Sequence, residues 1–138
     1  MTVDGEVLNP AGKLLLCTVA NGQFVGGSYR CAPRSKNDDG LLEVCLVKPV
    51  SRLRFLRLMD AYKEGRHLSD PRFDDVIVYR RGSRVNISSP DPHFACSLDG
   101  EVLFDSELSV SVAEKAIRFS VPASAAPIGQ LEGEEVLA

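Results

Sequence analysis

Short hydrophobic segments recur along most of this chain, separated by turns rich in glycine, asparagine and aspartate. Residues 14–20 form a continuous apolar run, as expected for a strand buried on both faces. Similar short segments occur at 24–32, 41–47, 74–79, 84–88, 94–98, 102–104, 107–112 and 116–121. Strands spaced in this way are typical of a β-sandwich or barrel. We therefore predict a mainly β fold, with a β-sandwich as its architecture.

One segment departs from the strand pattern and predicts a single main helix at about residues 51–65. Ser51 can cap its first turn, and Gly65 can end it in the left-handed conformation. Apolar side chains recur at helical spacing and would form one face: Phe55, Leu56, Met59 and Tyr62. Arg54 and Arg57 lie off that face.

The length of 138 residues suits a single domain. We assign residues 1–122 to the β-sandwich. Residues 123–138 are rich in alanine, serine and proline and then in glutamate, so they are predicted to form a disordered tail.

Composition narrows the class of protein without identifying it. The chain is 44% hydrophobic and 25% charged, which is ordinary for a soluble globular protein. Its net charge of −3 argues against nucleic acid as a partner, because proteins that bind it are usually basic. No apolar run approaches the roughly 20 residues that span a bilayer, and the N-terminus lacks a secretory pattern.

Charge is nevertheless distributed unevenly. Residues 48–84 contain ten basic and five acidic side chains, a net charge of +5. This basic middle could face an anionic surface such as lipid headgroups or nucleotide phosphates. Arginine and lysine that merely solvate the outside of a helix explain the same pattern.

The cysteines point to a reducing compartment. Cys17, Cys31, Cys45 and Cys96 form no Cys-x-x-Cys pair, so a zinc knuckle or thioredoxin motif is not indicated. The first three lie within apolar runs, which favours free thiols that act as small hydrophobic groups. We therefore expect a cytoplasmic protein.

Two acidic turns and one glycine-rich turn offer candidate chemistry. The loop around Asp39 could hold Mg²⁺ through one carboxylate and nearby carbonyls, although a solvated turn is the simpler interpretation. Glu101, directly after Asp99-Gly100, could act as a general base or be merely solvated. Asn21 and Gly22 could bring backbone close to a ligand or form an ordinary turn.

These motifs occur in a familiar order: Val-Ala-Asn-Gly at 19–22, Gly-Gly at 26–27, Ala-Pro at 32–33, Asp-Asp-Gly-Leu-Leu-Glu-Val at 38–44 and Asp-Gly-Glu at 99–101. Together with the segment at 117–122, the order resembles the C-terminal lobe of bacterial diacylglycerol kinase-like lipid kinases. That family includes sphingosine kinase relatives and is structurally akin to NAD kinases. The resemblance covers about residues 14–122.

The resemblance implies one lobe of a two-lobed enzyme that transfers phosphate from ATP to diacylglycerol or a similar hydroxyl lipid. In the family, an N-terminal lobe binds ATP and carries Gly-Gly-Asp-Gly-Thr, a sequence that does not occur in this chain. We therefore expect the chain to be inactive alone and to need the missing N-terminal lobe as its partner. Mg²⁺ is the implied cofactor.

The resemblance also implies roles for particular residues. Asp39 would bind Mg²⁺ through its carboxylate, with the backbone carbonyls of Lys36 and Leu41 beside it. Glu101 would accept the proton of the lipid hydroxyl as that oxygen attacks the γ-phosphate of ATP. The sequence Asp-Gly-Glu-Val-Leu occurs at 4–8 and again at 99–103, so Glu6 has the same neighbours as Glu101. Glu6, however, lies at a point where the family has no base.

The implied partner is a membrane lipid, and the implied location is the inner face of the membrane, with the protein peripheral to it. Arg52, Arg54 and Arg57 could approach such a surface. Weaker substrate-binding candidates are Asn21, Gly22, Arg54 and Arg57. A homodimer is left open. Two other functions fit the residues: a non-catalytic lipid-binding or regulatory module, and the matching half of an NAD kinase.

Overall fold

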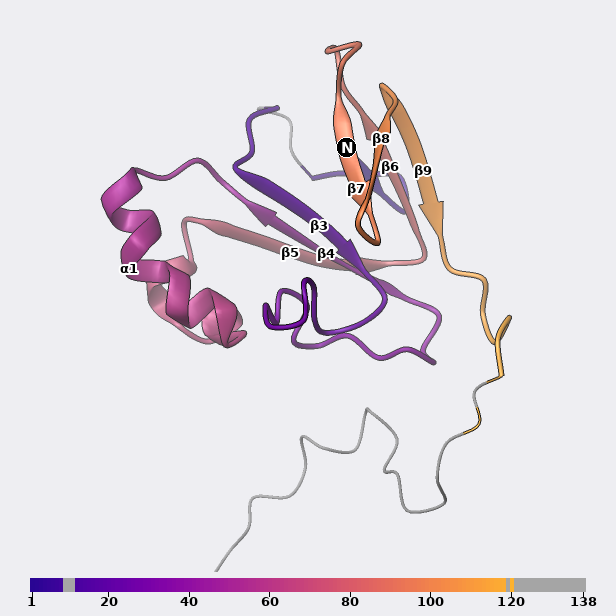
Figure 1. The fold of residues 1–138 in the computed structure, drawn as a ribbon, viewed down its shortest axis with the longest axis horizontal. Helices are drawn as coiled ribbons and strands as arrows, with labels where there is room; N and C mark the ends of the chain where they lie inside the picture. Colours follow the sequence, from indigo (N-terminus) through magenta and orange to yellow (C-terminus); the bar gives the residue numbers. More distant parts are fainter. Residues whose placement is uncertain (9–11, 119, 121–138) are drawn as a thin grey trace, which may run out of the picture.

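The computed structural model describes residues 1–8, 12–118 and 120, and within them the fold is mainly β with one main helix (Figure 1). The strands form two antiparallel sheets and a separate two-stranded hairpin. This arrangement confirms the predicted fold class. The predicted tail at 123–138 lies outside the described residues.

One sheet contains both the N-terminal strands and later strands of the chain. Its order is β2-β1-β6-β9, and every neighbouring pair is antiparallel. The strands are β1 (Thr2–Val3), β2 (Glu6–Val7), β6 (Arg84–Ser88) and β9 (Glu107–Ser111).

The second sheet has β4 at its centre, with β3 and β5 at its edges. The strands are β3 (Leu16–Ala20), β4 (Leu42–Val47) and β5 (Ile77–Gly82). Every residue of β4 is buried, and successive side chains of a strand point to opposite faces. Packing on both sides of the sheet therefore explains why every residue of this strand except Glu43 is apolar.

The core of the sandwich lies between the two sheets. Val44 and Leu46 from β4 pack there against Val3 of β1 and Val85 of β6. The opposite face of β4 supports a second cluster, in which Val47 meets residues of the helix and the turns that follow it: Leu58, Ala61, Phe73 and Val76.

The main helix, α1 (Arg52–Lys63), begins and ends as its caps predict. The Ser51 hydroxyl accepts a hydrogen bond from the Arg54 amide (3.3 Å), and Gly65 has φ +78° just after the helix. Two short 3₁₀ helices follow, η1 (Arg66–Leu68) and η2 (Pro71–Phe73). No helix among the described residues is long and apolar enough to cross a membrane.

The predicted apolar face of α1 is correct for Phe55, Met59 and Tyr62, which border a pocket between the helix and the sheet, and wrong for Leu56. Leu58 and Ala61 are the buried residues of the helix, whereas Phe55 is 40% exposed and Leu56 is 68% exposed. Helical spacing shows which side chains share a face, but the tertiary packing decides which face turns toward the sheet.

The hairpin consists of β7 (Ala95–Leu98) and β8 (Glu101–Phe104), joined by a tight turn. Asp99 and Gly100 in that turn have φ +48° and +98°. The turn between β1 and β2 has the same sequence pair, Asp4-Gly5, with φ +47° and +88°. The repeated Asp-Gly-Glu sequence thus makes two hairpin turns of similar backbone geometry.

Three predicted strands need correction. Residues 24–32 form a loop with a single bridge between Val25 and Tyr29, because Gly26 and Gly27 both adopt positive φ. The strand predicted at 74–79 begins only at Ile77, after η2. The described residues within 116–121 form no strand.

Candidate functional site

The acidic loop before β4 is fixed to the sheet by a network of charges. Asp39 accepts a hydrogen bond from the Leu41 amide on Oδ1 (3.0 Å) and an ion-paired hydrogen bond from Arg81 on Oδ2. Arg81 also donates through Nε to Glu43 Oε1 (2.6 Å). Glu43 and Arg81 are cross-strand partners on β4 and β5, and Glu43 is only 1% exposed. One guanidinium therefore joins the loop to a buried carboxylate.

The donor set of this loop fits Mg²⁺. Magnesium is usually held by one or two carboxylates, with other oxygens and water. An ionised carboxylate offers about four lone-pair positions, and Asp39 uses two of them for Leu41 and Arg81. Asp39 therefore keeps acceptor capacity, in the loop that also contains Lys36 and Leu41. The described residues contain no cluster of three or more metal-binding side chains.

A second carboxylate, that of Glu114, lies against the same loop, although no motif in the sequence singles it out. A side-chain carbon on Gly40 would clash with the carboxylate of Glu114, so the glycine lets Glu114 approach the loop. Gly40 also has φ +71°, which disfavours a side chain. Glu114 follows β9, so only the tertiary fold brings it to this turn.

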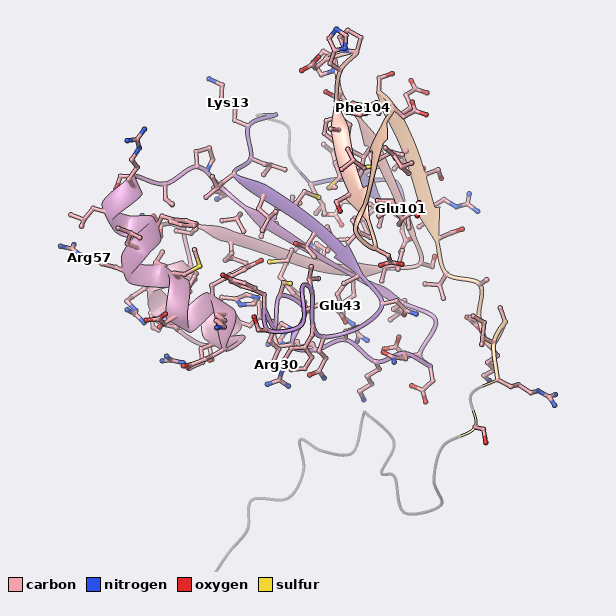
Figure 2. The ribbon with its side chains drawn as sticks, in the orientation of Figure 1. Lys13, Arg30, Glu43, Arg57, Glu101 and Phe104 are labelled. Carbon is pink, nitrogen blue, oxygen red and sulfur yellow. The ribbon has the colours of Figure 1, made fainter. Side chains whose placement is uncertain are left out.

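Glu101 stands in a different environment, as the first residue of β8 at the tip of the hairpin (Figure 2). It is exposed, and within the described part of the chain its carboxylate has no hydrogen bond or ion pair. An exposed, unpaired carboxylate on a tight turn is open to a substrate hydroxyl. No hydrogen bond or ion pair between described residues joins Glu101 to Asp39.

An apolar pocket of about 270 Å³ lies between α1 and the β3–β4–β5 sheet. Its lining has no charged side chain and consists of Leu15, Leu16, Val47, Val50, Phe55, Leu58, Met59, Tyr62, Phe73 and Val76. Leu15, Leu16 and Phe55 are 40–49% exposed, so they form the mouth. The pocket could not be predicted from the sequence, because its walls come from four separate segments of the chain.

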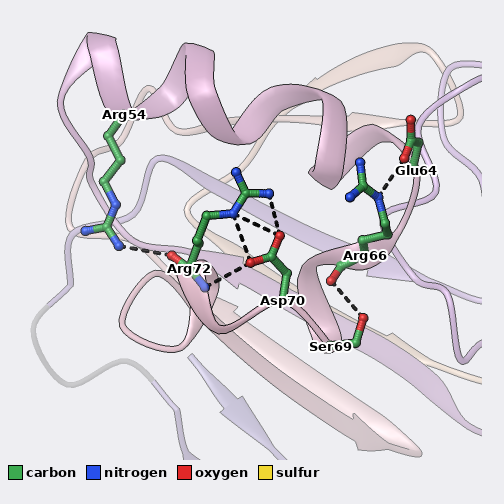
Figure 3. Close-up of polar contacts among 6 residues, drawn as sticks. All are labelled: Arg54, Glu64, Arg66, Ser69, Asp70 and Arg72. Carbon is green, nitrogen blue, oxygen red and sulfur yellow. Dashed lines mark hydrogen bonds and ion pairs between the residues drawn. The ribbon is translucent and has the colours of Figure 1, made fainter.

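The weaker substrate-binding candidates do not converge on one place. Asn21 and Gly22 follow β3, whereas Arg54 and Arg57 are on α1. The Arg54 guanidinium is already paired within the chain: it binds Asp75 at 2.5 and 2.8 Å. It also donates to the Arg72 carbonyl at 3.1 Å, as Figure 3 shows. Arg57 is exposed and points away from the body of the molecule (Figure 2).

The four cysteines are free thiols, as predicted, and two of them, Cys31 and Cys45, are buried. Cys45 on β4 is completely buried, 3.9 Å from Nε2 of His67, and burial raises its pKa to about 12. His67 is itself buried and stacks on Tyr62, with ring centroids 4.8 Å apart. Burial also lowers the pKa of His67. This cluster serves packing rather than thiol chemistry.

Comparison with known proteins places the whole sandwich in one family. Residues 1–121 match the model of the YegS C-terminal NAD kinase beta sandwich-like domain. The chain is 29% identical to a diacylglycerol kinase of Bacillus subtilis over 98 residues, which is 71% of this chain and 30% of the relative. It is 29% identical to a probable YegS-like lipid kinase of Chromohalobacter salexigens over 123 residues, 89% of this chain and 37% of the relative.

A plant protein extends the comparison. The sphingoid long-chain bases kinase 1 of Arabidopsis thaliana is 38% identical over 79 residues, covering 56% of this chain and 10% of the relative. The chain thus spans between about a tenth and two fifths of the length of these three relatives.

Proposed function

This chain belongs to the family of YegS C-terminal NAD kinase beta sandwich-like domains, and from that membership we propose that it is the C-terminal lobe of an ATP-dependent lipid kinase. The substrate is diacylglycerol or a similar lipid with a free hydroxyl. The names of the relatives support a lipid substrate, since they include a diacylglycerol kinase and a sphingoid base kinase.

The apolar pocket is the observation that carries the choice of a lipid. Its volume of about 270 Å³ lies just below the roughly 300–1,000 Å³ typical of pockets for whole small molecules. With no charged residue in its walls, it suits an acyl chain rather than a nucleotide. The lipid's chain would lie under α1, leaving the hydroxyl outside the pocket.

Glu101 is the group that we propose to accept the proton. As the lipid oxygen attacks the γ-phosphorus of ATP, the O–H proton passes to the Glu101 carboxylate, the new P–O bond forms, and ADP leaves. Phosphoryl transfer depends mainly on positioning and charge neutralisation, so a correctly placed base completes what the site must supply. The exposure of Glu101 leaves it accessible to both substrates.

Asp39 would hold Mg²⁺ together with the backbone carbonyls of Lys36 and Leu41. Bound there, the ion would offset the negative charge of the phosphates. Arg81 has a positioning role in this proposal, because it fixes the Asp39 carboxylate relative to Glu43.

ATP would be bound by a second lobe. The chain lacks Gly-Gly-Asp-Gly-Thr and covers only a minor part of each relative compared above. We therefore propose that the chain is inactive alone and works with an N-terminal nucleotide-binding lobe. The complete enzyme would be cytoplasmic and peripheral to the inner face of the membrane, with no role for nucleic acid. A homodimer is a separate question that light scattering would answer.

The matching half of an NAD kinase is the second candidate, favoured by the family's structural relation to those enzymes. The uncharged pocket favours the lipid. A non-catalytic lipid-binding module would keep the pocket but have no use for Glu101.

The proposal is tested by changing Glu101→Gln in the complete enzyme and measuring phosphate transfer from ATP to diacylglycerol. Loss of a general base is expected to lower turnover between roughly a hundredfold and ten-thousandfold. Glu6→Gln is the matched control, because Glu6 is an exposed glutamate after the same Asp-Gly turn. Equal activity of both variants would refute the role of Glu101.

A further inference from the structure

Exposed apolar side chains lie on α1 and β3, the two elements that supply the mouth of the pocket. Leu53 is 58% exposed and Leu56 is 68% exposed on α1, next to Phe55 at the mouth. Leu15 and Leu16 continue this group from β3, with 49% and 45% exposure. Several large apolar side chains exposed on neighbouring elements indicate a surface that contacts a partner or a membrane.

Leu53 and Leu56 contribute to neither hydrophobic core cluster. They are three residues apart and so share one face of α1, whereas the buried residues of the helix are Leu58 and Ala61. Their exposure therefore contributes nothing to the packing of α1 on the sheet, and it costs solvation free energy until something covers them.

Cations border this apolar surface. Arg52 and Arg57 flank the two leucines on α1, and Lys13 precedes Leu15. All three are exposed and have no ion pair within the described residues. Figure 2 shows Lys13 and Arg57 pointing away from the body of the molecule. Asp60, one turn beyond Leu56, is the exposed acidic residue of the helix.

We propose that this surface, formed by Leu15, Leu16, Leu53, Phe55 and Leu56 with Lys13, Arg52 and Arg57 at its border, docks on an anionic bilayer. The leucines enter the interface and the cations meet lipid phosphates, as in interfacial amphipathic helices. The pocket mouth then faces the acyl region, so a lipid chain passes from bilayer to pocket without crossing water. This inference rests on the proposed function and specifies how its substrate reaches the site.

Charge decides for a membrane over a second protein lobe. Each Lys or Arg near an anionic bilayer strengthens binding about fivefold. Arg54 does not take part, because Asp75 holds its guanidinium. The β7–β8 hairpin also has exposed apolar residues, among them Leu98 and Phe104, but its strands and turn contain no basic residue.

The test measures how the complete protein that carries this chain sediments with vesicles, without ATP. Leu53→Ser/Leu56→Ser is expected to lower binding to phosphatidylglycerol–phosphatidylcholine vesicles at least tenfold. The matched control Leu98→Ser/Phe104→Ser removes two equally exposed apolar residues from the hairpin and should bind as wild type does. Circular dichroism and melting temperature establish that all variants are folded.

A second pair of measurements addresses the charges. Arg52→Gln/Arg57→Gln should lower binding to the anionic vesicles about twentyfold or more, with little change on pure phosphatidylcholine. The docking surface would be refuted if the leucine variant bound vesicles as wild type does, or if the hairpin control lost as much binding as the leucine variant. It would also be refuted if the leucine substitutions changed the oligomeric state and not vesicle binding.

The docking surface and the proposed function can be refuted independently of each other. A protein that binds vesicles through these residues but phosphorylates no lipid would refute the proposed function and keep the surface. A kinase whose leucine variant is as active as wild type on vesicles would refute the surface and keep the function. Micelle-dispersed short-chain diacylglycerol should be phosphorylated equally by the wild type and the leucine variant.

Discussion

The β3–β4–β5 sheet and the β7–β8 hairpin carry the two halves of the candidate site in contrasting ways. On the sheet, Asp39 is tied through Arg81 to the buried Glu43, and the pocket lies under a packed helix. On the hairpin, Glu101 has no described partner, and Phe104 is 71% exposed. The proposed metal-binding residue and the proposed lipid pocket therefore lie on the packed sheet, whereas the proposed base lies on an exposed hairpin turn.

This difference also suggests which part of the molecule depends on its surroundings. A two-stranded hairpin is only marginally stable alone, and neither β7 nor β8 hydrogen-bonds with another sheet. The helix-covered sheet needs no such help, because β4 is buried on both faces. We therefore expect the hairpin to gain order when the rest of the enzyme covers it.

Thiol reactivity should show the largest contrast between the two regions. Cys45 is buried on β4, and burial raises the pKa of its thiol and so disfavours the reactive thiolate, whereas Cys96 lies half-buried on β7. Alkylation followed by mass spectrometry should find Cys45 at least a hundredfold slower than Cys96. If Cys45 and Cys96 are alkylated at equal rates in the folded protein, and unfolding does not change those rates, Cys45 is not buried as the structure indicates.

Truncating one apolar side chain in each region should affect stability very differently. Leu46→Ala removes a fully buried side chain from β4 and should lower the free energy of unfolding by about 3 kcal/mol. Phe104→Ala removes an exposed ring from β8 and should change it by less than about 0.5 kcal/mol. Urea unfolding measures both. A large loss for Phe104→Ala would mean that the hairpin packs more tightly than the structure indicates.

The charge network offers a smaller test. Arg81→Gln leaves the buried Glu43 carboxylate without its guanidinium, which should lower the unfolding free energy by about 2 kcal/mol after allowing for the partial exposure of Arg81. Glu43→Gln/Arg81→Gln should recover part of that loss. If the double variant is as unstable as the sum of the single variants, the two side chains do not act as a pair.

The smallest expected effect is a pH dependence at the surface beside α1. Side-chain hydrogen bonding from Arg72 holds the pKa of Asp70 at about 2 (Figure 3). Because this pKa is lowered, the stabilisation is present above pH 4 and is lost as the pH falls toward 2. The melting-temperature difference between wild type and Asp70→Asn should therefore shrink over that range. A difference that is constant with pH would exclude this ion pair as its source.

Local signals in the sequence were sufficient for the elements that depend on nearby residues. Ser51 and Gly65 delimit the helix because caps act within a few residues, and Asp99-Gly100 specifies its hairpin turn for the same reason. The apolar run at 14–20 does form a strand, but the predicted burial on both faces is wrong: β3 lies at the edge of its sheet, with Leu16 45% exposed, and the strand buried on both faces is β4.

Contacts between residues that are far apart in the sequence could not be predicted from it. Arg81 reaches Asp39 across 42 positions, and Glu114 reaches Gly40 only through the fold. Helical spacing could not tell whether Leu56 faces the core or the solvent. Motifs therefore identified Asp39 and Glu101 as candidate site residues. The ion pair between Asp39 and Arg81, and the apolar pocket, became visible only in the tertiary structure.

The most direct test of the central claim compares two phosphate acceptors for the complete enzyme. ATP labelled in its γ-phosphate is supplied with either diacylglycerol in anionic vesicles or NAD⁺, and the labelled products are separated and counted. Our account predicts labelled phosphatidic acid and no labelled NADP⁺. Labelled NADP⁺, or no labelled lipid from a folded enzyme that binds ATP, would contradict it.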